Sequence, residues 1–239
     1  IRLSLVGSEM CIRDSYKALE FTGDTVENMT VASRMCMSNM AIEAGAKCAL
    51  FTPDEKTAEY CKIALTQKER DLVGDADAQY CRVIEYKAEE FVPVMACPSN
   101  VDNVKPVSEL VDREIDQVFI GSCTNGRLED LMAAAEVLKG KHGAPFVKLI
   151  VTPASRKIYQ EAATNGTLAV LAEAGAIITH PSCGLCCGRT GGILTDGETV
   201  IATNNRNFLG RMGTSKVNIY LASPKTAAAC AAEGKIIVP

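Results

Sequence analysis

The sequence predicts an α/β protein with three layers, in which mostly parallel sheets lie between helices. Strand-like and helix-like segments alternate along the chain, most clearly in its second half. The strand-like segments there are nearly continuous apolar runs, which is typical of strands in a sheet that helices cover on both faces. The 239 residues are enough to bury a substantial core, in one large domain or in two smaller ones.

The first half begins with a helical pattern. Met35 and Ile42 recur at helical spacing, and Ser33 can cap the helix that contains them. Pro53 ends the short apolar run that follows this helix. These patterns predict, in order, a helix over 33–46, a strand over 47–51, a helix over 53–65 and a strand over 80–88.

The second half alternates more clearly. Its first helix has acidic residues in the first turn, Lys139 in the last turn and Gly140 as the stop signal. The apolar runs and end signals predict strands over 116–122, 146–153, 176–181, 197–204 and 217–224, and helices over 127–140, 155–166, 167–175 and 225–234. Parallel strands need such helical connections between them.

Two stretches interrupt this pattern. Residues 93–106 contain three prolines and several turn-forming residues, so we expect a domain boundary there, with domains over 16–105 and 106–239. A long loop would have the same composition. Residues 1–15 have no helix or strand period and resemble translated adapter sequence. We therefore expect them to be non-native, rather than an irregular natural terminus.

Charge and composition exclude several classes of partner. The net charge is −4 and the basic residues are dispersed, so we expect no nucleic-acid partner and no membrane partner. The richest apolar run, over 168–178, is too short to span a bilayer. The 11 cysteines are odd in number and mostly scattered, which favours a reducing, cytoplasmic location over a disulfide framework. With two histidines, His142 and His180, the chain is not expected to hold a histidine-rich metal site.

Cysteines follow two of the predicted strands, at the point where each strand ends. Cys123 lies just after the strand over 116–122, and Cys183, Cys186 and Cys187 lie just after the strand over 176–181. Loops at the carboxyl ends of parallel strands form the usual ligand crevice of an open α/β sheet. The two cysteine-bearing loops are therefore expected to meet.

Four interpretations of these thiols have to be weighed on spacing alone. A close C-x-x-C pair with a third cysteine from another loop suits an iron–sulfur cluster, and the surrounding glycines let backbone N–H groups approach sulfide. A zinc site would need a fourth ligand, such as Cys187 or His180. A thioredoxin-like redox pair normally begins a helix, whereas the glycines here favour an extended loop. The thiols could also be purely structural.

Several motifs, in order and spacing, resemble the large subunits of the 3-isopropylmalate dehydratase family, in the aconitase superfamily. They are "IGSCTNGRLEDL", "CGLCCG", "GGILTDGE" and "NRNFLGRMG", together with "RMCMSNMAIEAGAK" and "YLASPKTAAACAAEGKI". The resemblance runs from about residue 20 to residue 236. Over this range the chain is similar to the C-terminal half of that subunit. It implies aconitase-like iron–sulfur domains.

The resemblance also implies a cofactor and a set of site residues. Cys123, Cys183 and Cys186 match the three cysteines that hold a [4Fe-4S] cluster in the family. Cys187 stands where the family more often has an aliphatic residue, so it is expected to be a neighbour of the cluster. The remaining matched positions are Arg206 and Arg211, which engage substrate carboxylate in the family, and the active-site neighbours Asn39, Glu43, Asn125 and Asn205.

The function implied by the resemblance is that of a hydro-lyase. Such an enzyme isomerises 2-isopropylmalate to 3-isopropylmalate by dehydration and rehydration, in leucine biosynthesis. The general base is expected on a small, swivelling subunit, and the N-terminal half of the family's large subunit is absent, so this chain alone is expected to be an incomplete catalyst. Homoaconitase and 2,3-dimethylmalate dehydratase large subunits are alternatives, as are a zinc or thiol binding domain and an inactive truncated product.

Overall fold

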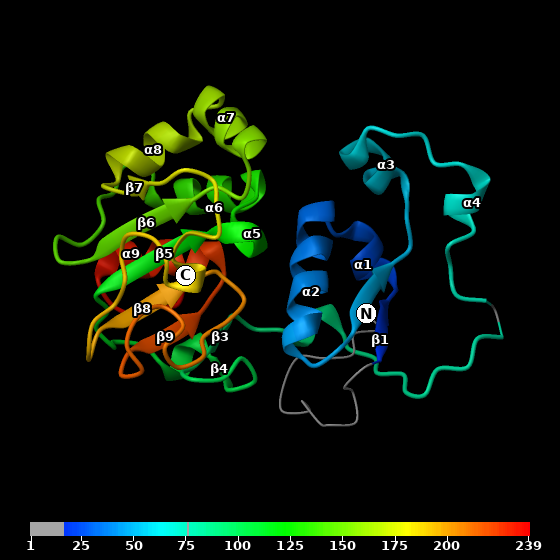
Figure 1. Ribbon diagram of the computed structural model, residues 1–239, viewed down its shortest axis with the longest axis horizontal. Coiled ribbons are helices and arrows are strands. Elements are labelled where there is room, and N and C mark those ends of the chain that lie inside the picture. Colours follow the sequence, from blue (N-terminus) through cyan, green and yellow to red (C-terminus); the bar gives the residue numbers. More distant parts are fainter. Residues whose placement is uncertain (1–16, 76) are drawn as a thin grey trace. The chain divides into compact units, whose positions relative to one another are not determined.

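The computed structural model describes residues 17–75 and 77–239 (Figure 1). The segment over 1–15, expected to be non-native, lies outside the described residues. The chain forms two compact units, which divide between Val92 and Pro93, and each unit is described by itself. No helix among the described residues is long and apolar enough to cross a membrane.

The first unit contains a pair of parallel strands and several helices. Its elements are β1 (Ala18–Phe21), α1 (Asp24–Asn28), α2 (Val31–Glu43), β2 (Cys48–Phe51), α3 (Glu55–Cys61), α4 (Gln67–Arg70) and the 3₁₀ helix η1 (Ala88–Glu90). The core between them is small. It includes Leu19, Val26 and Ala41, and the rings of Phe21 and Phe51 stack with their centroids 5.1 Å apart.

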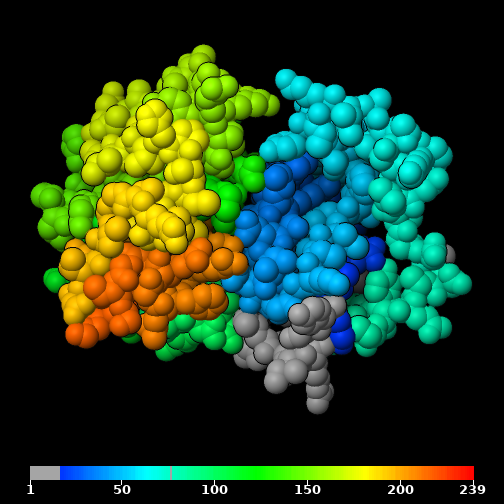
Figure 2. Space-filling model, viewed as in Figure 1, coloured from blue at the N-terminus to red at the C-terminus, as the bar shows by residue number. Residues whose placement is uncertain are grey.

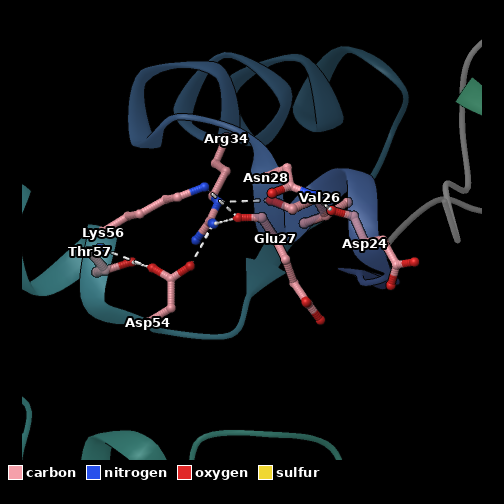
Figure 3. Close-up of polar contacts among 8 residues, drawn as sticks. All are labelled: Asp24, Val26, Glu27, Asn28, Arg34, Asp54, Lys56 and Thr57. Atoms are coloured by element: carbon pink, nitrogen blue, oxygen red, sulfur yellow. Dashed lines mark hydrogen bonds and ion pairs between the residues drawn. The ribbon is translucent and has the colours of Figure 1, made fainter.

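The helices of the first unit are joined by polar contacts (Figure 3). Arg34, buried on α2, donates to the carbonyl oxygens of Val26 and Glu27 and to Asp54 Oδ2, the last at 2.6 Å. Asp54 also caps α3, because its Oδ1 accepts a hydrogen bond from the Thr57 N–H at 3.0 Å. One buried guanidinium therefore holds α1, α2 and the start of α3 together.

Two predictions for the first unit need correction. The cap of α2 is Thr30, whose Oγ1 accepts from the Ser33 N–H at 3.1 Å, so the cap lies three residues earlier than the predicted Ser33. The strand expected over 80–88 is absent from these described residues, which are irregular up to η1. Alternating residues form a strand only where a partner strand accepts their hydrogen bonds, and β1 and β2 pair with each other.

The second unit is built on a seven-stranded sheet with the order β4-β3-β9-β8-β5-β6-β7. Its strands are β3 (Val94–Ala96), β4 (Val104–Pro106), β5 (Gln117–Gly121), β6 (Lys148–Thr152), β7 (Ile177–Ile178), β8 (Thr199–Ala202) and β9 (Asn218–Leu221). The strands from β9 to β7 are parallel, whereas β3 pairs antiparallel with both β9 and β4. The predicted α/β class with a mostly parallel sheet is confirmed.

The two faces of this sheet are covered differently. The helices are α5 (Ser122–Asn125), α6 (Leu128–Leu138), α7 (Arg156–Thr164), α8 (Thr167–Glu173), α9 (Pro224–Glu233) and the 3₁₀ helices η2 (Val107–Glu109) and η3 (Gly184–Cys187). On β5, Val118 and Ile120 pack in the same core as the residues of α6, α7, α8 and α9. Phe119, which points to the other face, packs in a core with Leu185 and Cys186.

Within the second unit, the second face of the sheet is thus covered by η3 and its flanking loops, where the sequence predicted a further layer of helices. In Figure 2 the yellow atoms of the segment that carries η3 lie on the surface of this unit that faces the viewer. The cysteine-rich segment therefore contributes to the fold as well as to the site, because Leu185 is fully buried and Cys186 is nearly so.

The segment over 93–106, expected to contain the domain boundary, belongs to the sheet of the second unit. β3 and β4 form an antiparallel hairpin within it. The Asn207 side-chain amide donates to the carbonyl oxygens of Cys97 and Asn100, at 2.7 and 3.1 Å, and fixes the turn of this hairpin. The two units accordingly divide at the start of this segment, before β3, and not after residue 105.

Candidate metal centre

The carboxyl ends of the parallel strands bring the two cysteine loops together. Cys123 lies on α5, the single turn of helix that directly follows β5, and η3, which follows β7, carries Cys186. Residues of α5 and η3 contact each other. The expectation that these loops meet is therefore confirmed, and it follows from the parallel order of β5, β6 and β7.

The turn between β5 and α5 has an unusual backbone. Gly121 has φ 133°, and a Cβ atom there would lie 2.0 Å from the Thr152 carbonyl oxygen, so no other residue fits. Ser122 has φ 69°, a left-handed conformation that residues with a Cβ rarely adopt. Such conformations persist where the surrounding structure holds them, and they concentrate at functional sites. Here the turn directs the chain from a buried strand to Cys123.

The Cys183 thiol is influenced by the other three thiols of this edge. Partial desolvation raises the pKa of the Cys183 thiol, and the negative charges of Cys123, Cys186 and Cys187 raise it further, while Arg211 lowers it. Negative charges on neighbouring thiolates repel one another, so each of them disfavours ionisation of Cys183. The sulfurs of both loops thus share one electrostatic environment.

Cys186 is the most enclosed of the four thiols. Its Sγ donates to Asn205 Oδ1 at 3.8 Å. Arg211 Nε donates to the Cys186 carbonyl oxygen at 2.7 Å, and Arg211 Nη2 lies 3.9 Å from Cys186 Sγ. Two residues predicted for the site, Asn205 and Arg211, are therefore in direct contact with a predicted metal ligand.

Cys123 is more exposed, and its loop is held mainly through the backbone. Its Sγ lies 4.0 Å from Thr124 Oγ1. Its carbonyl oxygen accepts a hydrogen bond from Arg127 Nη2 at 3.2 Å. The Asn125 side-chain amide donates to the Thr203 carbonyl oxygen at 2.7 Å. Asn125 therefore ties the Cys123 loop to the chain that follows β8.

Close backbone packing shapes the loop of the other cysteines. A Cβ atom at Gly184 would lie 2.7 Å from Thr152 Oγ1, and one at Gly188 would lie 2.7 Å from the Arg211 carbonyl oxygen. Cys187, half-buried, has its thiol 3.7 Å from the Gly184 carbonyl oxygen. These two glycines let η3 and the residue after it lie against β6 and against the backbone of Arg211.

The donor set fits an iron–sulfur cluster in its chemistry. Cysteines from two contacting loops lie at one edge of the sheet, small residues leave room for close approach of the backbone, and Arg211 supplies a positive charge beside Cys186. Among the described residues, no three His, Cys, Asp or Glu side chains are arranged to hold a metal ion. A cluster binds each cysteine through a different iron, so it does not require the sulfurs to converge on one ion.

The other predicted site residues lie in different places. Arg206 is half-buried in the loop after β8, and its carbonyl oxygen accepts from Asn204 Nδ2 at 2.7 Å. Asn39 and Glu43 lie four residues apart on α2, where Glu43 is buried. They belong to the first unit, so the structure does not assign them to the cysteine loops of the second.

Three residues of this region were not anticipated from the sequence. Thr203 and Asn207 are buried and hydrogen-bonded to the Cys123 loop and to the β3–β4 hairpin, respectively. Asp130 lies in the first turn of α6, where burial raises its pKa to about 6. The sequence contained one signal for the first two: a run of polar residues directly after a buried strand, as at the other two loops of this edge.

Comparison with known proteins identifies similar sequences along nearly the whole chain. The profile of the aconitase family (aconitate hydratase) matches residues 14–116 and 108–234. The 3-isopropylmalate dehydratase large subunit 1 of Methanopyrus kandleri is 50% identical over 225 residues, which cover 94% of this chain and 54% of the relative. The corresponding large subunit of a Sulfurihydrogenibium species is 47% identical, over 94% of this chain and 52% of the relative.

A relative with a different name is almost as similar. The probable methanogen homoaconitase large subunit of Methanosarcina mazei is 47% identical over 239 residues, which are 100% of this chain and 60% of that protein. The chain thus spans little more than half the length of the curated relatives it matches.

Proposed function

Because this chain belongs to the aconitase family, we propose that it forms part of the large subunit of a [4Fe-4S] hydro-lyase. One observation supports this proposal most strongly. The loops of Cys123 and of Cys183–Cys187 meet at the carboxyl edge of the sheet, beside Asn205 and Arg211. A binding domain with purely structural thiols would not require these polar and sulfur side chains in one place.

In this proposal Cys123, Cys183 and Cys186 hold the cluster. When bound, the cluster supplies a Lewis acid that favours departure of the substrate's hydroxyl group. Asn205 and Arg211 keep the Cys186 loop in position through the hydrogen bonds described above. Cys187, on the same turn, packs beside the ligands and is not one of them.

The arginines are the residues we propose for substrate recognition. A guanidinium group binds a carboxylate with two parallel hydrogen bonds, which fixes the orientation of a dicarboxylate. Arg206 directly follows Asn205, so it lies next to the residue that accepts from the Cys186 thiol. Arg211 contacts Cys186, so a carboxylate bound to its remaining donors would lie beside the ligand loop. Asn39, Glu43 and Asn125 remain proposed neighbours of the active site.

The rest of the catalyst is proposed to lie outside this chain. The relatives are named large subunits and are nearly twice as long, so a small subunit and a further part of the large subunit are implied. We place the general base on the small subunit. We also propose a cytoplasmic location, because the cysteines of the described residues are free thiols, which a reducing compartment preserves.

The substrate we propose is 2-isopropylmalate, isomerised to 3-isopropylmalate by dehydration and rehydration in leucine biosynthesis. Relatives named 3-isopropylmalate dehydratase large subunits support this choice. The similarity to the Methanosarcina mazei protein supports a homoaconitase as the second candidate. Both substrates are hydroxy-acids with several carboxylates, which suits a site with two arginines.

The test of this function is an activity assay of the reassembled enzyme. This chain would be joined to the unmatched part of the Methanopyrus kandleri large subunit and combined with that organism's small subunit. We expect turnover of 2-isopropylmalate exceeding that of homocitrate, and no turnover by this chain alone. A preference for homocitrate would favour the homoaconitase, and activity of the isolated chain would refute the need for the other parts. Bound zinc without sulfide would instead indicate a zinc or thiol binding domain.

A further inference from the structure

Thr203 connects the Cys123 loop to the chain that follows β8. It is fully buried directly after the last residue of β8. Its backbone N–H donates to the Phe119 carbonyl oxygen at 3.0 Å, and its Oγ1 accepts from the Gly121 N–H at 2.8 Å. Its carbonyl oxygen accepts from Asn125 Nδ2 at 2.7 Å. One residue therefore contacts the Cys123 loop on both sides of the cysteine.

The segment that Thr203 begins also contacts the second cysteine loop. Asn205, two residues later, accepts from the Cys186 thiol at 3.8 Å. Arg211, at the end of the segment, donates to the Cys186 carbonyl oxygen at 2.7 Å. Residues 203–211 consequently form a bridge between the two loops, with Thr203 attached to the loop of Cys123 and Arg211 attached to the loop of Cys186.

The bond from Gly121 to Thr203 is the part of this bridge that acts closest to Cys123. Gly121 and Ser122 both have positive φ angles, so the turn that leads into Cys123 is not the conformation the chain would adopt by itself. The Thr203 hydroxyl satisfies the Gly121 N–H in a place where water does not reach. Loss of this acceptor would leave a buried donor unsatisfied and release the turn.

We propose that Thr203 is a positioning residue of the metal centre, whose hydroxyl group fixes the Gly121 peptide and thereby the place of Cys123 relative to Cys186. This inference rests on the cluster of the proposed function. It assigns the hydroxyl a role separate from folding, because the hydrogen bond to Gly121 fixes the position of the Cys123 loop relative to the Cys186 loop.

The variants Thr203→Val and Thr203→Ser separate the hydroxyl from the shape of the side chain. Valine keeps the volume and removes the acceptor, whereas serine keeps the acceptor. Thr226→Val is the matched control, because Thr226 is equally buried in the second unit and its Oγ1 lies 2.9 Å from Ser223 Oγ, at the start of α9. Both valine variants lose one buried hydroxyl, but only one of them touches the Cys123 loop.

The experiment uses the full chain, reconstituted anaerobically with iron and sulfide. We would measure iron and sulfide per chain, the electron paramagnetic resonance of the mildly oxidised cluster, and the rate at which a chelator removes the iron. Outer partners of metal ligands commonly change metal affinity by about 10- to 100-fold. We therefore expect iron loss at least about tenfold faster, with an altered resonance, in Thr203→Val, and wild-type behaviour in Thr203→Ser.

The control decides between positioning and folding. Thr226→Val is expected to keep the wild-type cluster even where its unfolding temperature falls as far as that of Thr203→Val. Equal iron loss from both valine variants, or a wild-type cluster in Thr203→Val, would overturn the inference while leaving the proposed cofactor intact. A wild-type chain that takes up no cluster would overturn the proposed cofactor itself, and this inference with it.

Discussion

Arg211 shows how one side chain combines support with recognition. Its Nε bond to the Cys186 carbonyl oxygen, at 2.7 Å, holds the turn of η3, and its Nη2 lies 3.9 Å from the Cys186 thiol. The motif resemblance indicated a carboxylate-binding arginine, and that role stays a proposal. The bracing role depends on how the loop after β8 approaches η3, which no local sequence pattern specifies.

Removal of the hydrogen bond from Arg211 to the Cys186 carbonyl oxygen should make the Cys186 thiol more accessible. In Arg211→Ala, without cluster, we expect the Cys186 thiol to react with a soluble thiol reagent at least about tenfold faster, because local opening would no longer break a charge-assisted hydrogen bond. Peptide mass spectrometry of the labelled chain measures the rate. Arg189→Ala is the control, since Arg189 is exposed on the same loop. Equal acceleration in both variants would refute the brace.

Asp130 gives the second unit a pH dependence that the sequence did not reveal. The carboxylate accepts from the Arg127 N–H at 3.0 Å, but burial outweighs this bond and raises the pKa of Asp130 from 3.8 to about 6. Because the pKa is higher in the folded state, the stabilising contribution of this group is present below about pH 4. It is lost as the pH rises through about 6.

The variant Asp130→Asn removes this charge and keeps an acceptor for Arg127. We expect the free energy of unfolding at pH 8 to rise by about 1–3 kcal/mol, and to change little near pH 4. Urea denaturation at both pH values measures the difference. Glu136→Gln, on the same helix but exposed, should change stability by less than about 0.5 kcal/mol. A stabilisation that is the same at both pH values would contradict the role of burial.

At the scale of elements, strands that are buried on both faces could be predicted from the sequence, whereas elements at the edge of a sheet or without a partner strand could not. The strands β5, β6 and β8 were predicted because each lies between two parallel neighbours and is apolar on both faces. The prediction of a strand over 80–88 was wrong, because this segment alternates in polarity but has no partner strand to pair with among the described residues. The hairpin of β3 and β4 was read as a linker, because prolines at the edge of a sheet resemble prolines in a loop.

The Arg34–Asp54 pair determines how the helices of the first unit are held. Burial alone would raise the pKa of Asp54, but hydrogen bonds from Arg34 and Thr57 outweigh it and lower the pKa from 3.8 to about 2. The folded state therefore favours the carboxylate. The stability from this pair is present above about pH 4 and is lost as the pH falls through about 2.

Asp54→Ala should destabilise the first unit by about 2 kcal/mol at pH 7, because it removes the cap of α3 and leaves the buried Arg34 without its carboxylate. Hydrogen exchange of the α2 amides, measured as a function of denaturant concentration, reports this loss. Glu55→Ala is the control, since Glu55 and its partner Arg70 are exposed. A loss of the same size in the control, or an unchanged α2, would show that the pair adds nothing.

At the scale of the whole chain, the two units differ in how completely they bury their strands. β1 and β2 form a two-stranded parallel pair over a small core, whereas β5 and β8 each have a parallel neighbour on both sides. Two-stranded pairs have little independent stability. The sequence could not reveal this difference, because the apolar residues of β2 resemble those of a fully covered strand.

Hydrogen exchange should report this difference directly. We expect amides of β5 and β8 to exchange at least about tenfold more slowly than those of β1 and β2. Mass spectrometry of the intact chain, followed by digestion, measures both sets in one sample. Equal protection of the two sheets would show that the first unit is as stable as the second.

The proposed ligands could be chosen from the sequence, whereas the residues that hold their loops in place could not. Cys123, Cys183 and Cys186 follow two parallel strands in the sequence, and this spacing alone predicts that they share one edge of the sheet. Thr203 and Asn207 act through contacts between segments far apart in the chain, such as the bond from Asn207 to Cys97. Such contacts depend on the final packing of loops and leave no periodic pattern in the sequence.

The central claim is that Cys123, Cys183 and Cys186 hold one cluster. The most direct test is anaerobic reconstitution of this chain and of its Cys123→Ser and Cys187→Ser variants, followed by iron and sulfide analysis and electron paramagnetic resonance. We expect about four irons and about four sulfides per chain in the wild type and in Cys187→Ser, and loss of both the stoichiometry and the resonance in Cys123→Ser. A cluster that survives Cys123→Ser, or one that requires Cys187, would contradict the claim.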